Sequence, residues 1–152
     1  MMQLIESVFS TRNDPEQIQV NAQQMKKLVA LHPSTLTELA DENGPVIWIL
    51  IIPTTQLIMQ QFIDKKITEK QLLDQTKPGL NLTSAYLCSA TTLPEYQGKG
   101  KTKELCMKAI REIGKTYPIK TLFVWPFTKE GYKLAASVAN VCGMELKVRT
   151  NS

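Results

Sequence analysis

The chain has 152 residues, of which 43% are hydrophobic, and its 18 basic and 14 acidic side chains give a net charge of +4 and a pI near 9.0. This size and apolar content predict one soluble domain, residues 1–152, with a core of its own. The basic excess is mild and contains no dense run of Lys or Arg, so it argues against a nucleic-acid partner and suits a small anionic ligand.

The N-terminal region predicts a strand followed by a helix. Residues 3–9 are a candidate first strand, and Asp14 followed by Pro15 is typical of a helix start. The helix ends near Leu31, just before the only histidine, His32, for which a surface cap is the simplest role. The apolar face of this helix consists of Ile18, Ala22, Met25, Leu28 and Val29.

A very apolar run, residues 45–53, comes next and is bracketed by two prolines. Its nine residues are too few for a membrane helix, and residues 1–10 lack the features of a secretory signal, so we expect no membrane partner. The run predicts a central strand buried on both faces, with residues 35–40 as its hairpin partner and residues 41–44 as the turn.

Residues 54–76 predict a helical insertion after this strand. Leu57, Ile58, Phe62 and Ile63 form one apolar face, and Thr68-Glu69-Lys70-Gln71 has the spacing of a capping box that opens a second short helix. Two roles stay open for the insertion, a lid over a substrate and a structural cover. The second is the ordinary role of an apolar helical face.

The C-terminal half predicts two strand–helix units and a last strand. Residues 85–93 and 119–125 are apolar enough to form buried strands. Residues 101–116 repeat apolar side chains every three or four positions, as an amphipathic helix does, and a second helix begins at Thr128 and ends at Gly143. In the last strand the apolar residues Met144, Leu146 and Val148 alternate with Glu145, Lys147 and Arg149, which we expect to be exposed.

The segment of residues 93–102, Leu-Pro-Glu-Tyr-Gln-Gly-Lys-Gly-Lys-Thr, is the most informative part of the chain. Two glycines flanked by lysines stand where a strand gives way to a helix, whose first N–H groups lack partners and whose dipole is positive. This arrangement is typical of a pyrophosphate cradle. The phosphate loop of nucleotide hydrolases matches at Gly100, Lys101 and Thr102, but Glu95 stands where its first glycine belongs.

The same segment more closely resembles the acyl-coenzyme A motif of the GCN5-related N-acetyltransferases, [RQ]-x-x-G-x-[GA]. Gln97, Gly100 and Thr102 take its three positions, although the family prefers Gly or Ala where Thr102 stands. The order of elements over residues 83–149 is also similar to that family. The resemblance implies an α/β (α+β) fold: a mixed, mostly antiparallel central sheet flanked by helices on both faces, with the helical insertion at about 54–76.

The resemblance also implies an activity and a ligand. Family members transfer the acetyl group of acetyl-coenzyme A to a primary amine by direct attack on the thioester, and no metal is required. The arm of the coenzyme pairs with the strand before the loop, and the amides of the loop hold the pyrophosphate. The coenzyme-binding positions implied here are Thr92, Leu93, Gln97, Gly98, Lys99, Gly100, Lys101 and Thr102.

The resemblance marks the catalytic side chains less clearly. The family's frequent proton-donating tyrosine falls at Ala139 and its frequent asparagine falls at Tyr132, whose hydroxyl is one candidate. The strand before the loop contains no acid, and Ser89 is the candidate there. Spacing does not choose among three acids that remain as bases, which are Glu38, Asp41 and Glu42.

Three functions therefore stay open: an acetyltransferase acting on a small-molecule or peptide amine, a degenerate member that binds acyl-coenzyme A without efficient transfer, and a non-enzymatic α/β interaction domain.

We also expect a partner subunit to cover the sheet edge after the last strand, which would give a homodimer. Cys88, Cys106 and Cys142 show no metal spacing, and we interpret them as core thiols of a cytoplasmic protein.

Overall fold

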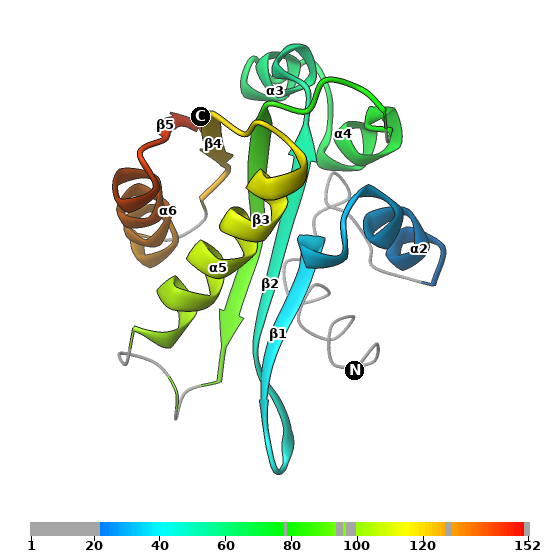
Figure 1. The fold of residues 1–152 in the computed structure, drawn as a ribbon. Helices are drawn as coiled ribbons and strands as arrows, with labels where there is room; N and C mark the ends of the chain where they lie inside the picture. The colour runs from blue at the N-terminus through cyan, green and yellow to red at the C-terminus, as the bar shows by residue number, and fades with distance from the viewer. Residues whose placement is uncertain (1–21, 78, 94–95, 97–99, 127–128, 151–152) are drawn as a thin grey trace.

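The computed structural model describes residues 22–77, 79–93, 96, 100–126 and 129–150 (Figure 1). The candidate strand at residues 3–9 and the predicted helix start at Asp14 lie outside these ranges, as does the predicted cap Thr128.

One mixed sheet forms the centre of the described structure. Its strands follow the chain order, and they are β1 (Leu36–Asp41), β2 (Gly44–Thr54), β3 (Ser84–Thr92), β4 (Thr121–Val124) and β5 (Glu145–Val148). β1, β2 and β3 pair antiparallel, whereas β3, β4 and β5 pair parallel over shorter stretches. By paired length the sheet is mostly antiparallel, as predicted, although β4 is shorter than the strand expected over residues 119–125.

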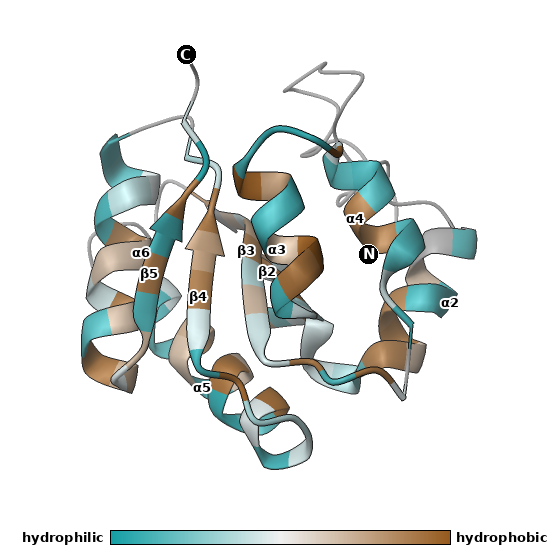
Figure 2. Ribbon diagram, turned by 90° about the horizontal axis from the view of Figure 1, so that it is seen from above, coloured by the Kyte–Doolittle hydropathy of each residue, from teal (hydrophilic) through white to brown (hydrophobic). Residues whose placement is uncertain are grey.

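Helices cover both faces of this sheet. One face carries α2 (Ala22–Leu31), α3 (Gln56–Ile63) and α4 (Glu69–Gln75), and the other carries α5 (Lys101–Thr116) and α6 (Lys129–Cys142). The short 3-10 helix η1 (Pro33–Thr35) connects α2 to β1. Figure 2 shows α6 and the α2–α4 group on opposite sides of the strands. The helical insertion at 54–76 is confirmed, and it consists of α3 and α4.

The strand β2 separates two hydrophobic cores. Its side chains alternate, so that Trp48 and Leu50 join the core under α2, α3 and α4, while Ile47 and Ile49 join the core under α5 and α6. We call these the α2–α4 core and the α5–α6 core. Every residue of β2 from Val46 onward is buried, which confirms the prediction of a central strand buried on both faces.

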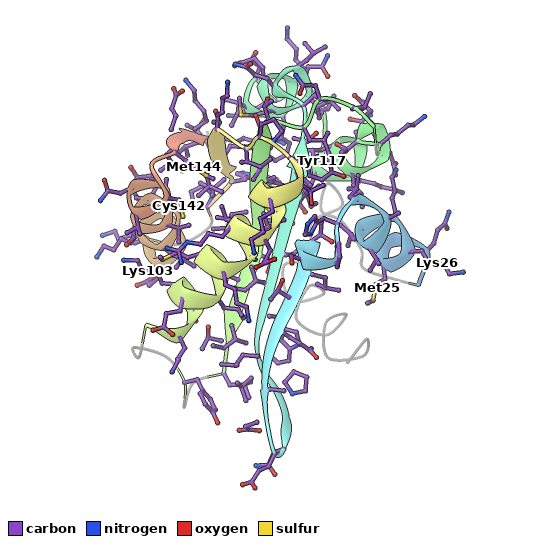
Figure 3. The ribbon with its side chains drawn as sticks, viewed as in Figure 1. Met25, Lys26, Lys103, Tyr117, Cys142 and Met144 are labelled. Atoms are coloured by element: carbon purple, nitrogen blue, oxygen red, sulfur yellow. The ribbon has the colours of Figure 1, made fainter. Side chains whose placement is uncertain are left out.

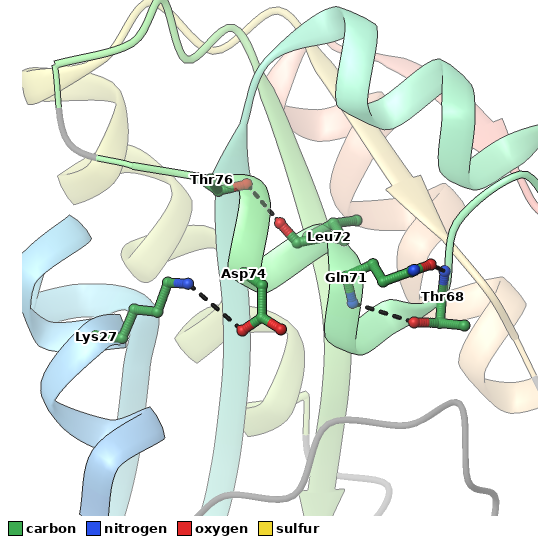
Figure 4. A network of polar contacts seen from close by, with 6 residues as sticks. All are labelled: Lys27, Thr68, Gln71, Leu72, Asp74 and Thr76. Carbon is green, nitrogen blue, oxygen red and sulfur yellow. Dashed lines mark hydrogen bonds and ion pairs between the residues drawn. The ribbon is translucent and has the colours of Figure 1, made fainter.

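Hydrogen bonds join the two ends of the helical insertion, and an ion pair joins it to α2. The hydroxyl groups of Thr54 and Thr76 lie 2.6 Å apart, and Thr76 also donates to the Leu72 carbonyl at 2.8 Å. The predicted capping box forms, since Thr68 accepts from the Gln71 N–H at 3.1 Å and the Gln71 side chain accepts from the Thr68 N–H at 2.8 Å (Figure 4). Lys27 of α2 and Asp74 of α4 form an ion pair at 3.5 Å (Figure 4). These contacts make the insertion a packed cover of the sheet.

The two C-terminal helices have the predicted ends. α5 spans Lys101–Thr116 and buries Cys106, Ala109, Ile110 and Ile113. Tyr117, labelled in Figure 3, follows the last residue of α5, and its hydroxyl donates to the Leu31 carbonyl at 2.6 Å. α6 stops at Gly143, whose φ of +68° is the left-handed conformation that ends many helices. Figure 3 labels Cys142, the last residue of α6, and Met144, which follows Gly143.

Candidate functional site

The strand β3 has a bulge near its middle. In its ladder with β2, Leu50 lies opposite Ser89 while Ile51 lies opposite Leu87, so that Cys88 is an extra residue on β3. A bulge bends its strand and increases the local twist, and bulges are common beside functional sites. The second half of β3 is therefore turned relative to the first half.

β3 and β4 separate beyond this bulge. Residues 84–87 of β3 pair with residues 121–124 of β4, whereas β3 continues to Thr92 with no further ladder on that side within the described strands. Residues 89–92 of β3 still pair with β2, on the other edge of the strand. A strand that extends past the end of its neighbour can pair with an extended ligand through main-chain hydrogen bonds.

Thr92 and Leu93, the two coenzyme-binding positions predicted at the end of the strand, direct their backbone N–H groups to opposite edges of β3. The Leu93 N–H donates to the Val46 carbonyl at 2.9 Å, so the sheet already uses the Leu93 amide. Because neighbouring residues of a strand direct their N–H groups to opposite edges, the Thr92 backbone lies on the edge beside β4. Of these two residues, Thr92 is the one whose backbone lies on the side where a ligand could pair.

The helix α5 begins close to the end of β3 without a side-chain cap. Its N-cap is Gly100, at φ +74°, and the first helical bond runs from the Glu104 N–H to the Gly100 carbonyl at 3.1 Å. The preceding N–H groups of the first turn have no partner inside the helix, and the sixteen-residue helix places its positive dipole end there. Lys101 and Lys103 add positive charge to the same turn, and Glu104 adds one negative charge.

A pair of threonines joins the end of β3 to this helix start. The hydroxyl groups of Thr92 and Thr102 are hydrogen-bonded to each other. The Thr102 side chain is therefore turned toward β3, which explains how a β-branched residue fits at a position where the resembled family prefers Gly or Ala. The structure brings these two predicted coenzyme-binding residues together.

Tyr96 connects the same region to the hairpin between β1 and β2. Its N–H donates to the Leu93 carbonyl at 2.9 Å, and its hydroxyl donates to Oδ2 of Asp41 at 2.5 Å. The Tyr96 hydroxyl, and after it the Asn43 N–H, hold the pKa of the exposed Asp41 carboxyl below its ordinary value of 3.8. Among the three acids that the sequence analysis kept as candidate general bases, Asp41 is thus already hydrogen-bonded within the protein.

The remaining predicted site residues fall in different places. Gly100 and Lys101 are exposed at the start of α5, whereas Gln97, Gly98 and Lys99 lie outside the described residues. Ser89 is half-buried on β3, and Tyr132 is 47% exposed on α6. Within the described ranges no hydrogen bond joins Ser89 to Tyr132, so the structure does not bring the two candidate catalytic residues together.

Glu38, another of the three candidate bases, lies on the same face of the sheet as Ser89. Glu38 lies opposite Trp48 on β2, and Ser89 lies opposite Leu50. Since directly opposite residues of an antiparallel pair point to the same face, Glu38 and Ser89 share the face of the α2–α4 core. The buried indole N–H of Trp48 has no hydrogen-bond partner in the described structure, which leaves one donor on this face for a water or ligand oxygen.

A buried charged cluster was missed by the sequence analysis. Glu69 is 1% exposed and accepts a 2.5 Å hydrogen bond from the Tyr86 hydroxyl. Arg149 is 5% exposed, in contrast to its predicted exposure, and its guanidinium lies 4.5 Å from the centre of the Phe62 ring and 4.3 Å from that of Trp125. Strand alternation does not reveal this burial, because the aromatic rings that receive Arg149 come from other elements.

The cysteines do not form a site. Cys88 and Cys106 are buried, Cys142 is half-buried, and none of the three forms a disulfide. Burial, and after it the charge of Cys142, raises the pKa of Cys106 to about 12, so this thiol stays protonated. Within the described ranges no group of three or more His, Cys, Asp or Glu side chains is placed to hold a metal ion.

None of the described helices combines the length and the apolar character needed to cross a bilayer. No protein-family model matches the chain, and no curated protein matches it either.

Proposed function

We propose that this protein binds acetyl-coenzyme A and transfers its acetyl group to a primary amine. The observation that carries the proposal is the juxtaposition of two features, the start of α5, which has no side-chain cap, and the end of β3, which extends past residue 87, where its ladder with β4 stops. The helix start offers backbone N–H groups and a positive dipole to a pyrophosphate. The strand edge offers a main-chain ladder to an extended amide arm.

The residues at this place suit such a ligand. Gly100 is exposed, and a Cβ added to it would meet no heavy atom of the described residues within 4 Å, which leaves room on their side for a phosphate to approach the backbone closely. Lys101 and Lys103 favour a polyanion. The Asp41 carboxylate disfavours a polyanion, but it accepts hydrogen bonds from the Tyr96 hydroxyl and the Asn43 N–H.

When bound, the coenzyme supplies the acetyl group as a thioester, and a C–N bond to the amine replaces the C–S bond. The backbone N–H of Thr92 is on the correct edge of β3 to polarise the carbonyl, whereas that of Leu93 is not. Glu38 shares a sheet face with Ser89 and is the acid we assign to take the amine proton, through water. The leaving thiolate takes its proton from water, because Tyr132 lies on α6, which covers the opposite face of the sheet from Glu38 and Ser89.

One observation favours a second function, binding without efficient transfer. Ala139, which stands where the resembled family has its proton-donating tyrosine, is buried in the α5–α6 core, so it leaves no hydroxyl there. In this alternative the protein retains the coenzyme site and has lost part of the chemistry. A non-enzymatic interaction domain is the remaining reading, in which the glycines serve only the turn. Three cysteines without a disulfide fit a reducing, cytoplasmic setting for each of these functions.

A thermal shift with acetyl-coenzyme A tests the proposal, with ATP–Mg²⁺ as the control ligand. At a concentration of about 100 Kd a ligand that binds only the folded state adds about 2.7 kcal/mol, which raises the Tm of a domain of this size by roughly 5–10 °C. A rise with acetyl-coenzyme A alone supports the coenzyme site, and release of free coenzyme A with a panel of amines then separates transfer from binding. No rise, or a rise with ATP only, would contradict the proposal.

A further inference from the structure

The helical insertion, α3 and α4, contacts three neighbouring strands near the point where the ladder between β3 and β4 stops. The last rung of this ladder joins Leu87 to Val124. Tyr86 stands one residue before this rung on β3, Trp125 is the first residue after β4, and Arg149 is the first residue after β5. In Figure 1, α3 lies at the same end of the molecule as β4 and β5.

On the β3 side, the insertion holds Tyr86 through a buried carboxylate. Glu69, the first residue of α4, is 1% exposed, and it accepts the hydrogen bond from the Tyr86 hydroxyl at 2.5 Å. Phe62 of α3 packs against the same tyrosine, with the two ring centres 4.9 Å apart. Because a buried carboxylate is costly unless it is hydrogen-bonded, this contact fixes α4 and β3 relative to each other.

On the side of β4 and β5, the insertion holds Trp125 and Arg149. The ring centres of Phe62 and Trp125 lie 6.0 Å apart, and the Arg149 guanidinium lies over both rings. The same guanidinium donates to the Ile67 carbonyl at 3.2 Å, and the Arg149 backbone N–H donates to the Val124 carbonyl at 2.8 Å. The insertion therefore bridges the two sides of the point where β3 and β4 stop pairing.

We propose that the insertion fixes the position at which β3 leaves β4, and that Tyr86 and Arg149 are positioning residues for the arm of the coenzyme. This inference rests on the proposed function, which places that arm on β3 past Leu87. A strand that is already ordered loses less conformational entropy when a ligand pairs with it. Both side chains act through this order and do not themselves need to touch the ligand.

The variants are Tyr86→Phe, which removes the hydroxyl on the β3 side, and Arg149→Met, which removes the charge on the other side. Tyr117→Phe is the matched control, because its hydroxyl also bonds across elements, to the Leu31 carbonyl at 2.6 Å, in a contact that involves no residue of the insertion. Arg149→Lys keeps the charge but loses the planar group that stacks on the rings, and it replaces Arg149→Met if that variant does not fold.

Hydrogen exchange in the free protein tests the positioning of β3 without any ligand. Its readout is the exchange rate of residues 84–92 relative to that of residues 36–47 in the β1–β2 hairpin. We expect Tyr86→Phe and Arg149→Met to raise this ratio several-fold and Tyr117→Phe to leave it unchanged. An unchanged ratio in either insertion variant, or an equal rise in Tyr117→Phe, would overturn the inference.

Binding of acetyl-coenzyme A and of ADP separates the arm from the pyrophosphate, since ADP has a pyrophosphate but no arm. Each insertion variant should raise the Kd of acetyl-coenzyme A about fivefold, the usual effect of immobilising one further group on binding, and should leave the Kd of ADP unchanged. An equal loss for ADP, or an equal loss in Tyr117→Phe, contradicts the inference. If the unaltered protein binds neither ligand, the proposed function fails, and the exchange ratio still decides whether the insertion positions β3.

Discussion

Replacing Gly100 by alanine should separate the conformational role of this glycine from its role in binding. Gly100 has a φ of +74°, and an L-residue in this left-handed region costs roughly 1–2 kcal/mol. A Cβ at this position meets no heavy atom of the described residues within 4 Å, so we expect no steric penalty in the free protein. For a domain of this size, a loss of roughly 1–2 kcal/mol lowers the Tm by about 2–8 °C.

Gly143 provides a matched control for this substitution. It lies at the C-terminal end of α6 with a φ of +68°, and its added Cβ also meets nothing within 4 Å. Gly143→Ala should therefore lower the Tm by a similar amount. Only Gly100→Ala should also weaken acetyl-coenzyme A, because a methyl group there occupies the space through which a phosphate approaches the backbone.

Asparagine at position 100 sharpens the test, since Asn enters the left-handed region more readily than Ala. We expect Gly100→Asn to recover part of the lost stability but none of the lost affinity. Differential scanning calorimetry gives the stability of each variant, and titration calorimetry gives its Kd for acetyl-coenzyme A. The reasoning is refuted if Gly100→Ala melts like the unaltered protein, or if Gly143→Ala loses as much affinity as Gly100→Ala.

Three further predictions concern residues away from Gly100. Arg149→Met should lower the free energy of unfolding by about 2–3 kcal/mol, because it removes two desolvated cation–π contacts and a bond to the Ile67 carbonyl; a urea midpoint that does not move would refute this. Tyr96→Phe should raise the pKa of Asp41 toward 3.8. An NMR titration that follows the chemical shift of the Asp41 carboxyl carbon over pH would measure this change. The folded pKa of Asp41 lies below the unfolded value, so this contact stabilises the fold above pH 3.8 and is lost as the pH falls through the folded pKa. Cys142 should be alkylated by iodoacetamide well before Cys106, whose protonated thiol is buried, and early labelling of Cys106 in a mass spectrum would be the contrary result.

Local patterns in the sequence predicted the elements of the fold well. The helix at Lys101–Thr116 was predicted to the residue, because a 3.6-residue apolar repeat and a following proline mark its two faces and its end. The strand β2 was predicted because few structures other than a doubly buried strand bury nine consecutive apolar or proline residues. The capping box of Thr68 and Gln71 depends on residues three apart, and it forms as expected.

The features that shape the candidate site depend on contacts between distant residues, and the sequence does not encode them locally. The bulge at Cys88 is a property of the register with β2, and nothing in the β3 sequence itself marks it. Asp41 was one of three equivalent acids until the structure placed it against Tyr96. Arg149 looked like an exposed strand residue because its neighbours alternate, yet rings from α3 and from the residue after β4 enclose it.

The contacts of Arg149 join residues that are far apart in the chain, and this separation affects the order in which the fold can form. Its guanidinium donates to the Ile67 carbonyl at 3.2 Å, across 82 residues of chain, and it fills the space between Phe62 and Trp125. Phe62 is synthesised before Arg149, and domains generally fold as units. The contacts that enclose the Phe62 ring are therefore completed only by a residue that follows β5, 87 positions later in the chain.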